Sequence, residues 1–310
     1  MKIAILGAGA MGSWFGGRLA LAGHEVNLLT TNRAHRDAIN SNGLILKSAR
    51  REECVDLPAL DPGEFSGPAE VIILFTKSFQ SDGALRSIAT ALDDNTHILT
   101  LQNGLGNAEI VSRYAPLERV MIGVTMMPVD KVGPGIVEST GEGGSHFNAA
   151  LDIDLPIVAQ LEAAFKAAGL DVQIDPDIHR RIWSKVAFNA GMNAVCALAH
   201  GTPGTIADSP GAQALVNKIA SEVAAVAGAE GITLDLNEIR DTIDYACKNH
   251  RDHKPSMHQD LLHARRTEVD ALNAAIVAAG ERLDVPTPLN SILATLVRVA
   301  ELSHQRYYST

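Results

Sequence analysis

The chain begins Met1-Lys2-Ile3-Ala4-Ile5-Leu6-Gly7-Ala8-Gly9-Ala10-Met11-Gly12, an apolar run that leads into three spaced glycines. Residues 2–6 have the composition of a buried strand, and residues 11–22 have helical periodicity that ends at Gly23. Glycines between a strand and a helix suit a dinucleotide: the first permits a tight turn, the second lets the backbone approach a pyrophosphate, and the third lets the helix pack closely. The helix N-terminus then meets the phosphates. The sequence therefore predicts cofactor contacts from Gly7, Ala8, Gly9, Ala10, Met11 and Gly12, against the alternative of a structural glycine turn.

Short β-type runs alternate with helical stretches through the rest of the first half. This pattern predicts parallel βαβ units, with further strands at 25–29, 71–75, 97–101 and 119–124. The segment 126–148 is rich in Gly, Pro and Thr and predicts short antiparallel strands. A helix at 155–168 and a last strand at 171–174 follow.

The alternation of strand and helix patterns ends after Asp175-Pro176-Asp177. Beyond this point there is no convincing strand pattern, and proline-containing breaks separate the helical stretches. Helices are predicted at 178–199, 209–231, 235–248, 256–283 and 288–303. The predicted fold class is a Rossmann-type α/β dinucleotide-binding domain over residues 1–175, followed by an all-α helical domain over residues 176–310.

The residues after the second predicted strand bear on which dinucleotide is bound. NAD-binding proteins usually place an acid there to bond the ribose 2′-hydroxyl. Here the chain reads Thr30-Thr31-Asn32-Arg33. Hydroxyl, amide and guanidinium groups suit a 2′-phosphate. We therefore predict NADP(H) rather than NAD(H), with Arg33 as a phosphate ligand; the alternative is a solvated surface arginine.

Two other predicted strands run into polar residues. The strand at 71–75 is followed by Thr76-Lys77-Ser78, and the strand at 97–101 by Gln102-Asn103-Gly104-Leu105-Gly106. Ligands of open parallel sheets bind at the carboxyl ends of strands. Lys77 and Asn103 are therefore expected to reach the cofactor or the substrate. A solvated lysine and an ordinary glycine turn are the alternatives.

Lys185, Asn189 and Asn193 lie four residues apart on a predicted helix that is otherwise apolar or small. Residues at this spacing share one helix face, and a buried polar face needs a polar partner. That partner is either a ligand with a carbonyl and a carboxylate or other protein groups. Further along, Ser256 is expected to be an N-cap or near-cap residue. Glu268 is expected on the 256–283 helix, where a row of alanines indicates the close approach of a ligand or of another backbone, and a salt bridge is the alternative.

Composition excludes several classes of function. The net charge of −10, without a basic run, disfavours nucleic acid. The chain has three widely spaced cysteines, which predict a reducing, cytoplasmic compartment, and no apolar run approaches a membrane span. The histidines at 250, 253, 258 and 263 do not have metalloenzyme spacing, so no metal site is expected. The oligomeric state stays open, because the segment Ala220–Ala229 could pack in the core or in a homodimer.

Several of these motifs occur together, in order and at matching spacing. They are Gly7–Gly12, Thr76-Lys77, Gln102-Asn103-Gly104, Ile182-Trp183-Ser184-Lys185 with Asn189 and Asn193, and Ser256-Met257-His258-Gln259-Asp260 followed by Arg266-Thr267-Glu268. In these residues the chain resembles the 2-dehydropantoate 2-reductase (ketopantoate reductase) family over nearly its whole length.

The resemblance implies NADPH-dependent reduction of ketopantoate to pantoate, with the active site in the cleft between the two domains. It implies Lys185 as the general acid and Glu268 as a second catalytic residue. Substrate contacts would come from Asn103, Asn189, Asn193 and Ser256, and Lys77 would lie by the cofactor. The chain departs from the family pattern at Thr30-Thr31, where many members have an arginine, and at Ala274, where many have glycine.

The sequence leaves three other functions open. The family also holds reductases of other 2-oxo acids. A β-hydroxyacid dehydrogenase would share the architecture, although its second domain lacks the Ser256 and Glu268 arrangement. A non-catalytic NADP(H)-sensing protein would have no need to retain a proton donor such as Lys185.

Overall fold

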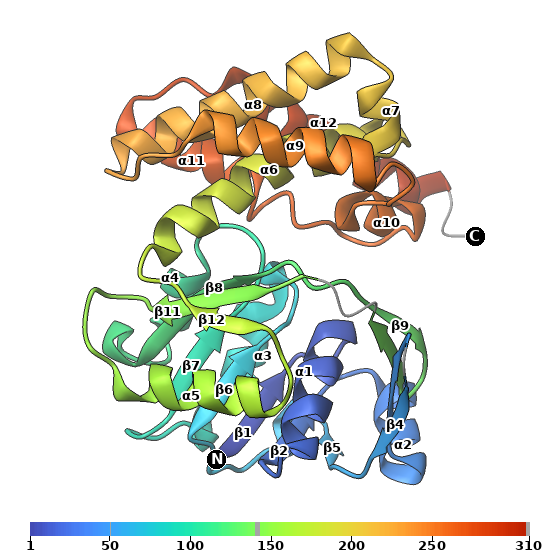
Figure 1. Cartoon of the computed structure of the whole chain (residues 1–310), viewed down its shortest axis with the longest axis vertical. Coiled ribbons are helices and arrows are strands. Elements are labelled where there is room, and N and C mark those ends of the chain that lie inside the picture. Colours follow the sequence, from blue (N-terminus) through green and yellow to red (C-terminus); the bar gives the residue numbers. More distant parts are fainter. Residues whose placement is uncertain (50, 140–142, 308–310) are drawn as a thin grey trace. The chain divides into compact units, whose positions relative to one another are not determined.

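The computed structural model describes residues 1–49, 51–139 and 143–307. The chain divides into two compact units (Figure 1). The first comprises Met1–Gln102 and Asn107–Ile178, and the second comprises Asn103–Gly106 and His179–Thr310. The short segment Asn103–Gly106 thus belongs with the C-terminal part of the chain.

The first unit is built on an eight-stranded sheet in the order β12-β11-β8-β7-β6-β1-β2-β5. Its strands are β1 (Lys2–Leu6), β2 (Glu25–Leu29), β5 (Ala59–Leu60), β6 (Val71–Leu74), β7 (His97–Thr100), β8 (Val120–Thr125), β11 (Ser145–Ala149) and β12 (Val172–Ile174). From β5 to β8 all neighbours are parallel, whereas β11 runs antiparallel to β8. The chain leaves β1 for β2 on one side and later returns to β6 on the other, which creates a switch point beside β1. The predicted Rossmann-type sheet is confirmed.

A second, four-stranded sheet belongs to the same unit. Its order is β4 (Glu52–Val55), β3 (Leu44–Ser48), β10 (Ile136–Ser139) and β9 (Val129–Gly133). β9 and β10 form the antiparallel pair predicted for this region, of which residues 140–142 lie outside the described residues. β3 pairs in parallel with β10, about 90 residues further along the chain. The strands at 44–55 were not predicted.

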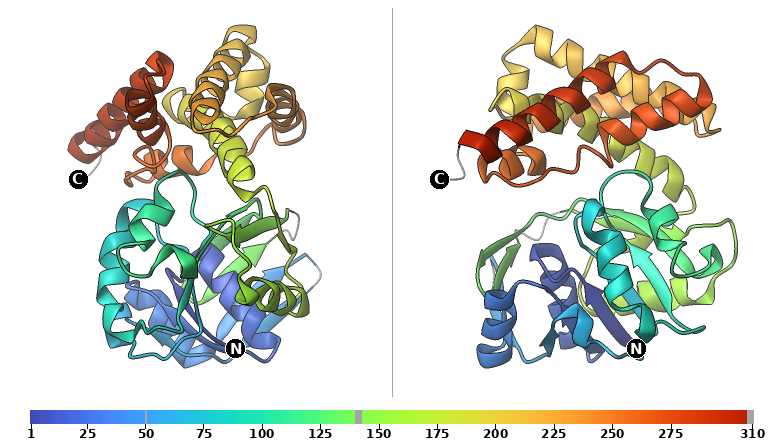
Figure 2. Two further views of the ribbon diagram at one scale, coloured as in Figure 1. Left: turned by 90° about the vertical axis from the view of Figure 1, so that its left-hand side faces the viewer. Right: turned by 180° about the vertical axis from the view of Figure 1, so that it is seen from behind.

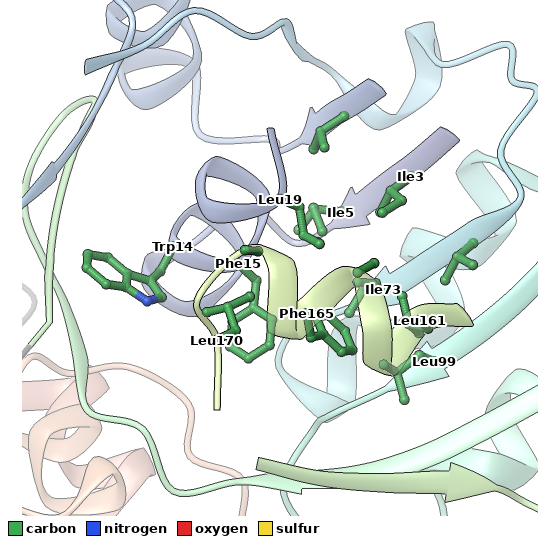
Figure 3. Packing of buried hydrophobic residues seen from close by; sticks show 14 of the residues in the cluster. Ile3, Ile5, Trp14, Phe15, Leu19, Ile73, Leu99, Leu161, Phe165 and Leu170 are labelled. Atoms are coloured by element: carbon green, nitrogen blue, oxygen red, sulfur yellow. The ribbon is translucent and has the colours of Figure 1, made fainter. Parts of the chain in front are cut away.

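Helices pack against the large sheet. They are α1 (Ala10–Leu21), α2 (Arg33–Asn42), α3 (Ser81–Ser87), α4 (Asn107–Val111) and α5 (Pro156–Ala167), with short 3-10 turns at Pro62–Glu64, Ser78–Gln80, Ala89–Ala91 and Leu117–Arg119. Phe15 of α1 meets Phe165 of α5 edge to face, with ring centroids 5.8 Å apart (Figure 3). Phe165 also meets Phe147 of β11 at 5.7 Å. Because all three rings are fully buried, these contacts fix α1 and α5 on the sheet.

In its described residues, the second unit consists of helices and connecting loops (Figures 1 and 2). The helices are α6 (Ile178–Leu198), α7 (Pro203–Ala207), α8 (Pro210–Ala229), α9 (Leu236–Asn249), α10 (Ser256–Leu262), α11 (Asn273–Leu283) and α12 (Pro288–Tyr307). The predicted all-α character is confirmed. None of the helices within the described residues is long and apolar enough to span a bilayer.

The single helix predicted at 256–283 is wrong. α10 ends at Leu262, and Ala264 has a φ of 52°, a left-handed conformation that stops a helix. The backbone N–H of Arg265 returns to the carbonyl of Asp260 at 2.8 Å. Glu268 therefore lies in a non-helical segment between α10 and α11 and does not share a helix face with alanines.

Candidate functional site

The glycine turn after β1 has the geometry that its sequence predicts. Gly7 has a φ of 100°, and a Cβ atom there would lie 2.5 Å from the backbone nitrogen of Thr76. A Cβ on Gly12 would lie 2.4 Å from the carbonyl oxygen of Gly7, so the glycine allows α1 to approach the turn. Above Gly9, by contrast, a Cβ would meet nothing within 4 Å. The turn thus leaves open space at the position where a phosphate would approach the backbone.

The start of α1 offers hydrogen-bond donors to that space. Gly9 is the N-cap, and its own N–H donates to the carbonyl of Gly7 at 2.7 Å. The backbone N–H groups of Ala10, Met11 and Gly12 donate to no acceptor in the part of the chain that the structure describes. Three open donors at the N-terminus of a twelve-residue helix fit the pyrophosphate of a dinucleotide.

The segment after β2 places Arg33 at the surface. Asn32 caps α2 by accepting from the N–H of His35 at 3.0 Å. Arg33 is the first residue of α2; its side chain is 85% exposed and pairs with Asp37 at 3.4 Å. This exposed i,i+4 pair is weak, so the guanidinium can exchange its partner for a stronger anion. The structure brings Arg33 to the N-terminus of α2, at the end of β2.

Lys77 and Gln102 follow the neighbouring strands β6 and β7. The Gln102 amide donates to Ser81 Oγ at 2.7 Å and to Thr76 Oγ1 at 3.1 Å. Its oxygen accepts from Thr100 at 3.0 Å. This buried network fixes the segment that begins with Thr76 to the end of β7. Lys77, half-buried directly after Thr76, leads into a 3-10 turn.

Three predicted site residues meet in the second unit. Lys185 of α6 donates from Nζ to Asn103 Oδ1 at 2.7 Å, and Asn103 Nδ2 lies 3.4 Å from Glu268 Oε2. Asn103 therefore bridges the ammonium and the carboxylate with both ends of its amide. Glu268 is 6% exposed, so its charge acts in a poorly solvated setting.

The Lys185 ammonium has an unusual acidity. Burial lowers the pKa of Lys185 to about 8, although the nearby Glu268 carboxylate acts in the opposite direction and raises it. A group with a pKa near neutrality is a more effective proton donor than an ordinary lysine. The pair thus gives α6 a cation that can release its proton at physiological pH.

The two asparagines of the α6 stripe are buried without protein partners. Asn189 and Asn193 are 7% and 6% exposed. In the described part of the chain neither side-chain amide makes a hydrogen bond, and α6 is continuous from Ile178 to Leu198. Lys185, Asn189 and Asn193 consequently share one face of a confirmed helix. Their amide groups are not fully enclosed, and amides that have no protein partner favour the ligand-facing interpretation of the stripe over a closed protein network.

Ser256 is the first residue of α10 and is exposed; Pro255 occupies the N-cap position. Its side chain makes no hydrogen bond within the described chain. The hydroxyl is thus accessible, and the structure does not link it to the Lys185, Asn103 and Glu268 cluster.

Sequence reasoning missed a buried hydrogen-bond network that joins α6 to three other helices. Asn273, fully buried, donates from Nδ2 to the carbonyl of Ala190 at 3.0 Å and to Asn290 Oδ1 at 3.1 Å. Asn290 in turn donates to Glu222 at 2.8 Å. These bonds tie α6, α8, α11 and α12 together next to Asn189. The only sequence signal was an asparagine at the start of an alanine-rich helix, which by itself also fits a surface cap.

Histidine, cysteine, aspartate and glutamate side chains form no group of three or more able to hold a metal within the described residues. The three cysteines, Cys54, Cys196 and Cys247, are free thiols.

The acidity of Lys185 predicts a pH dependence. With Lys185 in the general-acid role that the resemblance to the reductase family implies, kcat/KM should be constant below about pH 8 and fall about tenfold per pH unit above it. Glu268→Gln removes the charge that raises the pKa of Lys185, so the falling limb should move to lower pH. Steady-state pH profiles check this, with Glu281→Gln, an exposed glutamate of α11, as the matched control. An unmoved limb in Glu268→Gln, or a limb equally moved in Glu281→Gln, contradicts the assignment.

A Rossmann-type sheet followed by a helical unit that carries a lysine among asparagines defines a class of two-domain dehydrogenase folds. Comparison with protein families narrows the class. Residues 3–151 match the family described as ketopantoate reductase PanE/ApbA, and residues 177–301 match its C-terminal domain. The chain belongs to the ketopantoate reductase family of oxidoreductases.

Curated relatives and solved structures agree with this membership. The 2-dehydropantoate 2-reductase of Streptococcus pyogenes serotype M3 is 33% identical over 97% of this chain and 98% of its own length. A ketopantoate reductase structure from Ralstonia eutropha JMP134 superposes with a TM-score of 0.90 at 32% identity, covering 98% of this chain and all of that one. D-mandelate dehydrogenase, solved with NADH and anilino(oxo)acetate, has a TM-score of 0.94 at 33% identity, with 98% and 100% covered.

Proposed function

We propose that this chain is an NADPH-dependent 2-dehydropantoate 2-reductase, which reduces the 2-oxo acid ketopantoate to pantoate for pantothenate biosynthesis. The observation that carries the proposal is the cluster of Lys185, Asn103 and Glu268, in which Lys185 lies on a helix face that also presents the unpartnered amides of Asn189 and Asn193. A ketone oxygen needs a proton donor, and a carboxylate needs amide or hydroxyl donors. Both are present on one helical unit.

Each residue of the site has its own role in the proposed reaction. Lys185 donates a hydrogen bond to the ketone oxygen and gives it a proton as negative charge develops there. Asn189 and Asn193, with Ser256, orient the substrate carboxylate and hydroxyl. Glu268 keeps Lys185 protonated until the reaction, because its charge opposes the effect of burial on the pKa.

A reduced nicotinamide dinucleotide, when bound, supplies the hydride that the ketone carbon receives. The open N–H groups at the start of α1 would hold its pyrophosphate. Lys77 and Asn103 would complete the contacts, and Arg33 would hold the 2′-phosphate. The cofactor is proposed as NADP(H) because no acid follows β2.

A substrate panel tests the function. The purified chain is assayed for oxidation of NADPH and of NADH with ketopantoate, with pyruvate and with the 2-oxo acid that is reduced to mandelate. The highest kcat/KM is expected for NADPH with ketopantoate. Binding of NADPH without turnover of any 2-oxo acid would instead indicate a non-catalytic sensor, and oxidation of 3-hydroxy acids with NADP⁺ would indicate the β-hydroxyacid class.

One alternative substrate has its own support. D-mandelate dehydrogenase, with NADH in its structure, is as similar to this chain in sequence as the curated 2-dehydropantoate 2-reductase. NADH-dependent reduction of an aromatic 2-oxo acid is therefore the second candidate. In the same panel it would appear as the higher kcat/KM with NADH and the mandelate-derived acid.

Arg33→Ala tests the cofactor preference. Loss of a charge-assisted bond to a 2′-phosphate should raise the KM for NADPH roughly 10- to 100-fold and leave that for NADH unchanged. Initial rates at varied cofactor concentration measure both values, with Arg240→Ala, an exposed arginine of α9, as the control. An unchanged KM for NADPH in Arg33→Ala removes the residue from this role.

A further inference from the structure

A buried histidine joins three separate segments of the first unit. His35 of α2 is 1% exposed. Its Nδ1 lies 2.9 Å from the backbone nitrogen of Gly135, and its Nε2 lies 2.9 Å from Ser13 Oγ. Ser13, fully buried on α1, has its Oγ 3.3 Å from the carbonyl oxygen of Ala8 in the glycine turn.

The direction of each hydrogen bond in this series follows from the backbone N–H of Gly135. Gly135 N–H can only donate, so Nδ1 of His35 must be the unprotonated acceptor. In a neutral ring Nε2 then carries the proton and donates to Ser13 Oγ. The Ser13 hydroxyl hydrogen is left to donate to Ala8. This series of hydrogen bonds, called the relay below, runs from Gly135 through His35 and Ser13 to the glycine turn. Each donor and acceptor in it has a partner.

The ring is neutral at ordinary pH. Burial, and to a smaller extent the positive charge of Lys131, lowers the pKa of His35 to about 4. The relay direction therefore holds across the range in which enzymes of this kind are assayed.

The relay ends on the peptide group that shapes the anion-binding turn. The carbonyl of Ala8 accepts from Ser13, and the N–H on the other side of the same peptide, that of Gly9, donates to Gly7. Both polar atoms of the Ala8–Gly9 peptide are thus held. This peptide directly precedes the three N–H groups at the start of α1 that have no acceptor in the described chain, so holding it fixes the position from which they begin.

His35 also acts on the segment after β2. Its backbone N–H donates to the Asn32 side chain, so the cap of α2 and the relay share one residue. Arg33, which would hold the 2′-phosphate, lies two positions before it. One residue therefore links the turn that would bind the pyrophosphate, through its ring, to the turn that would bind the adenosine ribose, through its backbone N–H.

We propose that His35 is a positioning residue for the dinucleotide, which sets the glycine turn through Ser13 and aligns it with the start of α2. This rests on the proposed dinucleotide site in the first unit. In this role the His35 ring would not touch the cofactor; it acts through Ser13 and Ala8.

Two substitutions distinguish the roles of the two ring nitrogens of His35. His35→Asn can keep the acceptor for Gly135 but cannot reach Ser13, whereas His35→Gln can place an amide donor near the position of Nε2. We expect His35→Asn and Ser13→Ala to weaken NADPH binding roughly 3- to 10-fold in fluorescence titrations, the effect of one lost hydrogen bond. His35→Gln should recover part of this loss. The KM for the 2-oxo acid, extrapolated to saturating cofactor, should not change.

The controls distinguish the possible failures. If the unaltered chain binds neither NADPH nor NADH, the proposed function itself falls. The positioning role falls, and the function stands, if the unaltered chain binds NADPH and both His35→Asn and Ser13→Ala bind it equally well. The same conclusion follows if the losses of NADPH affinity follow the melting temperature alone and are alike in His35→Asn and His35→Gln.

A spectroscopic measurement covers the case in which the variants fail to fold. Nitrogen-15 NMR of the unaltered chain should show the His35 ring with Nε2 protonated and Nδ1 unprotonated, unchanged from about pH 6 to pH 8. A protonated Nδ1, or a ring that titrates in this interval, would overturn the relay.

Discussion

Lys185→Ala is expected to lower kcat for 2-oxo acid reduction roughly 10²- to 10⁴-fold, the scale of a positioned general acid. Lys185 is the cation of its cluster, its pKa is about 8, and it shares a helix face with two unpartnered amides. The dissociation constant for NADPH should be retained, since the residues proposed to hold the dinucleotide lie mainly on the glycine turn and after β2. Stopped-flow reduction rates and cofactor titrations measure the two effects separately.

A second substitution at the same position separates charge from proton donation. Lys185→Arg retains a cation, but the guanidinium does not give up its proton. If protonation of the alkoxide is the function, Lys185→Arg should stay close to Lys185→Ala. Lys218→Ala, an exposed lysine of α8, should have the turnover of the unaltered chain. Near-normal turnover in Lys185→Ala would remove the residue from catalysis, and full recovery by arginine would assign it an electrostatic role only.

Local sequence patterns predicted most of the first unit. β1 and β2 match the expected residues, because buried apolar runs bounded by glycine and polar turns have few other stable arrangements. The β3 and β4 hairpin was missed although its two strands pair with each other locally. The parallel pairing of β3 with β10, far along the chain, could not be predicted from a local pattern.

The segment around Glu268 shows how tertiary contacts override helix propensity. Residues 256–283 are rich in good helix formers, yet the helix is interrupted. Thr267 N–H donates to Glu301 of α12 at 2.6 Å, and the carbonyl of Ala271 accepts from Leu105 at 2.8 Å. A continuous helix would lose both bonds. The interruption is what brings Glu268 to Asn103.

The candidate site itself was only partly predictable. Helical spacing alone predicted that Lys185, Asn189 and Asn193 share a face, and α6 confirms the helix. Nothing local could predict that Asn103, 82 residues earlier, would bond to Lys185. That proximity depends on the short segment 103–106 packing with the helices. The resemblance to a family implied only that Asn103 and the α6 residues contact the same ligand.

Gly104→Ala is expected to have the largest combined effect on stability and activity. Gly104 has a φ of 90°, and an added Cβ would lie 2.3 Å from the carbonyl oxygen of Ala271. The strained backbone and the clash should destabilise the fold by about 2–4 kcal/mol. Because the segment must move, Asn103 should lose its place between Lys185 and Glu268, and kcat/KM should fall on the order of 10²-fold.

Gly106 provides a control two residues away in the same segment. It also has a positive φ, 82°, but an added Cβ would meet nothing within 4 Å. Gly106→Ala should therefore cost only the conformational strain, about 1–2 kcal/mol, and leave kcat/KM close to that of the unaltered chain. Thermal melts and steady-state rates below the melting range compare the two variants. Only the clash with Ala271 differs between the two substitutions. Equal losses of kcat/KM would therefore show that strain in the segment, and not the close approach of Gly104 to Ala271, controls the position of Asn103.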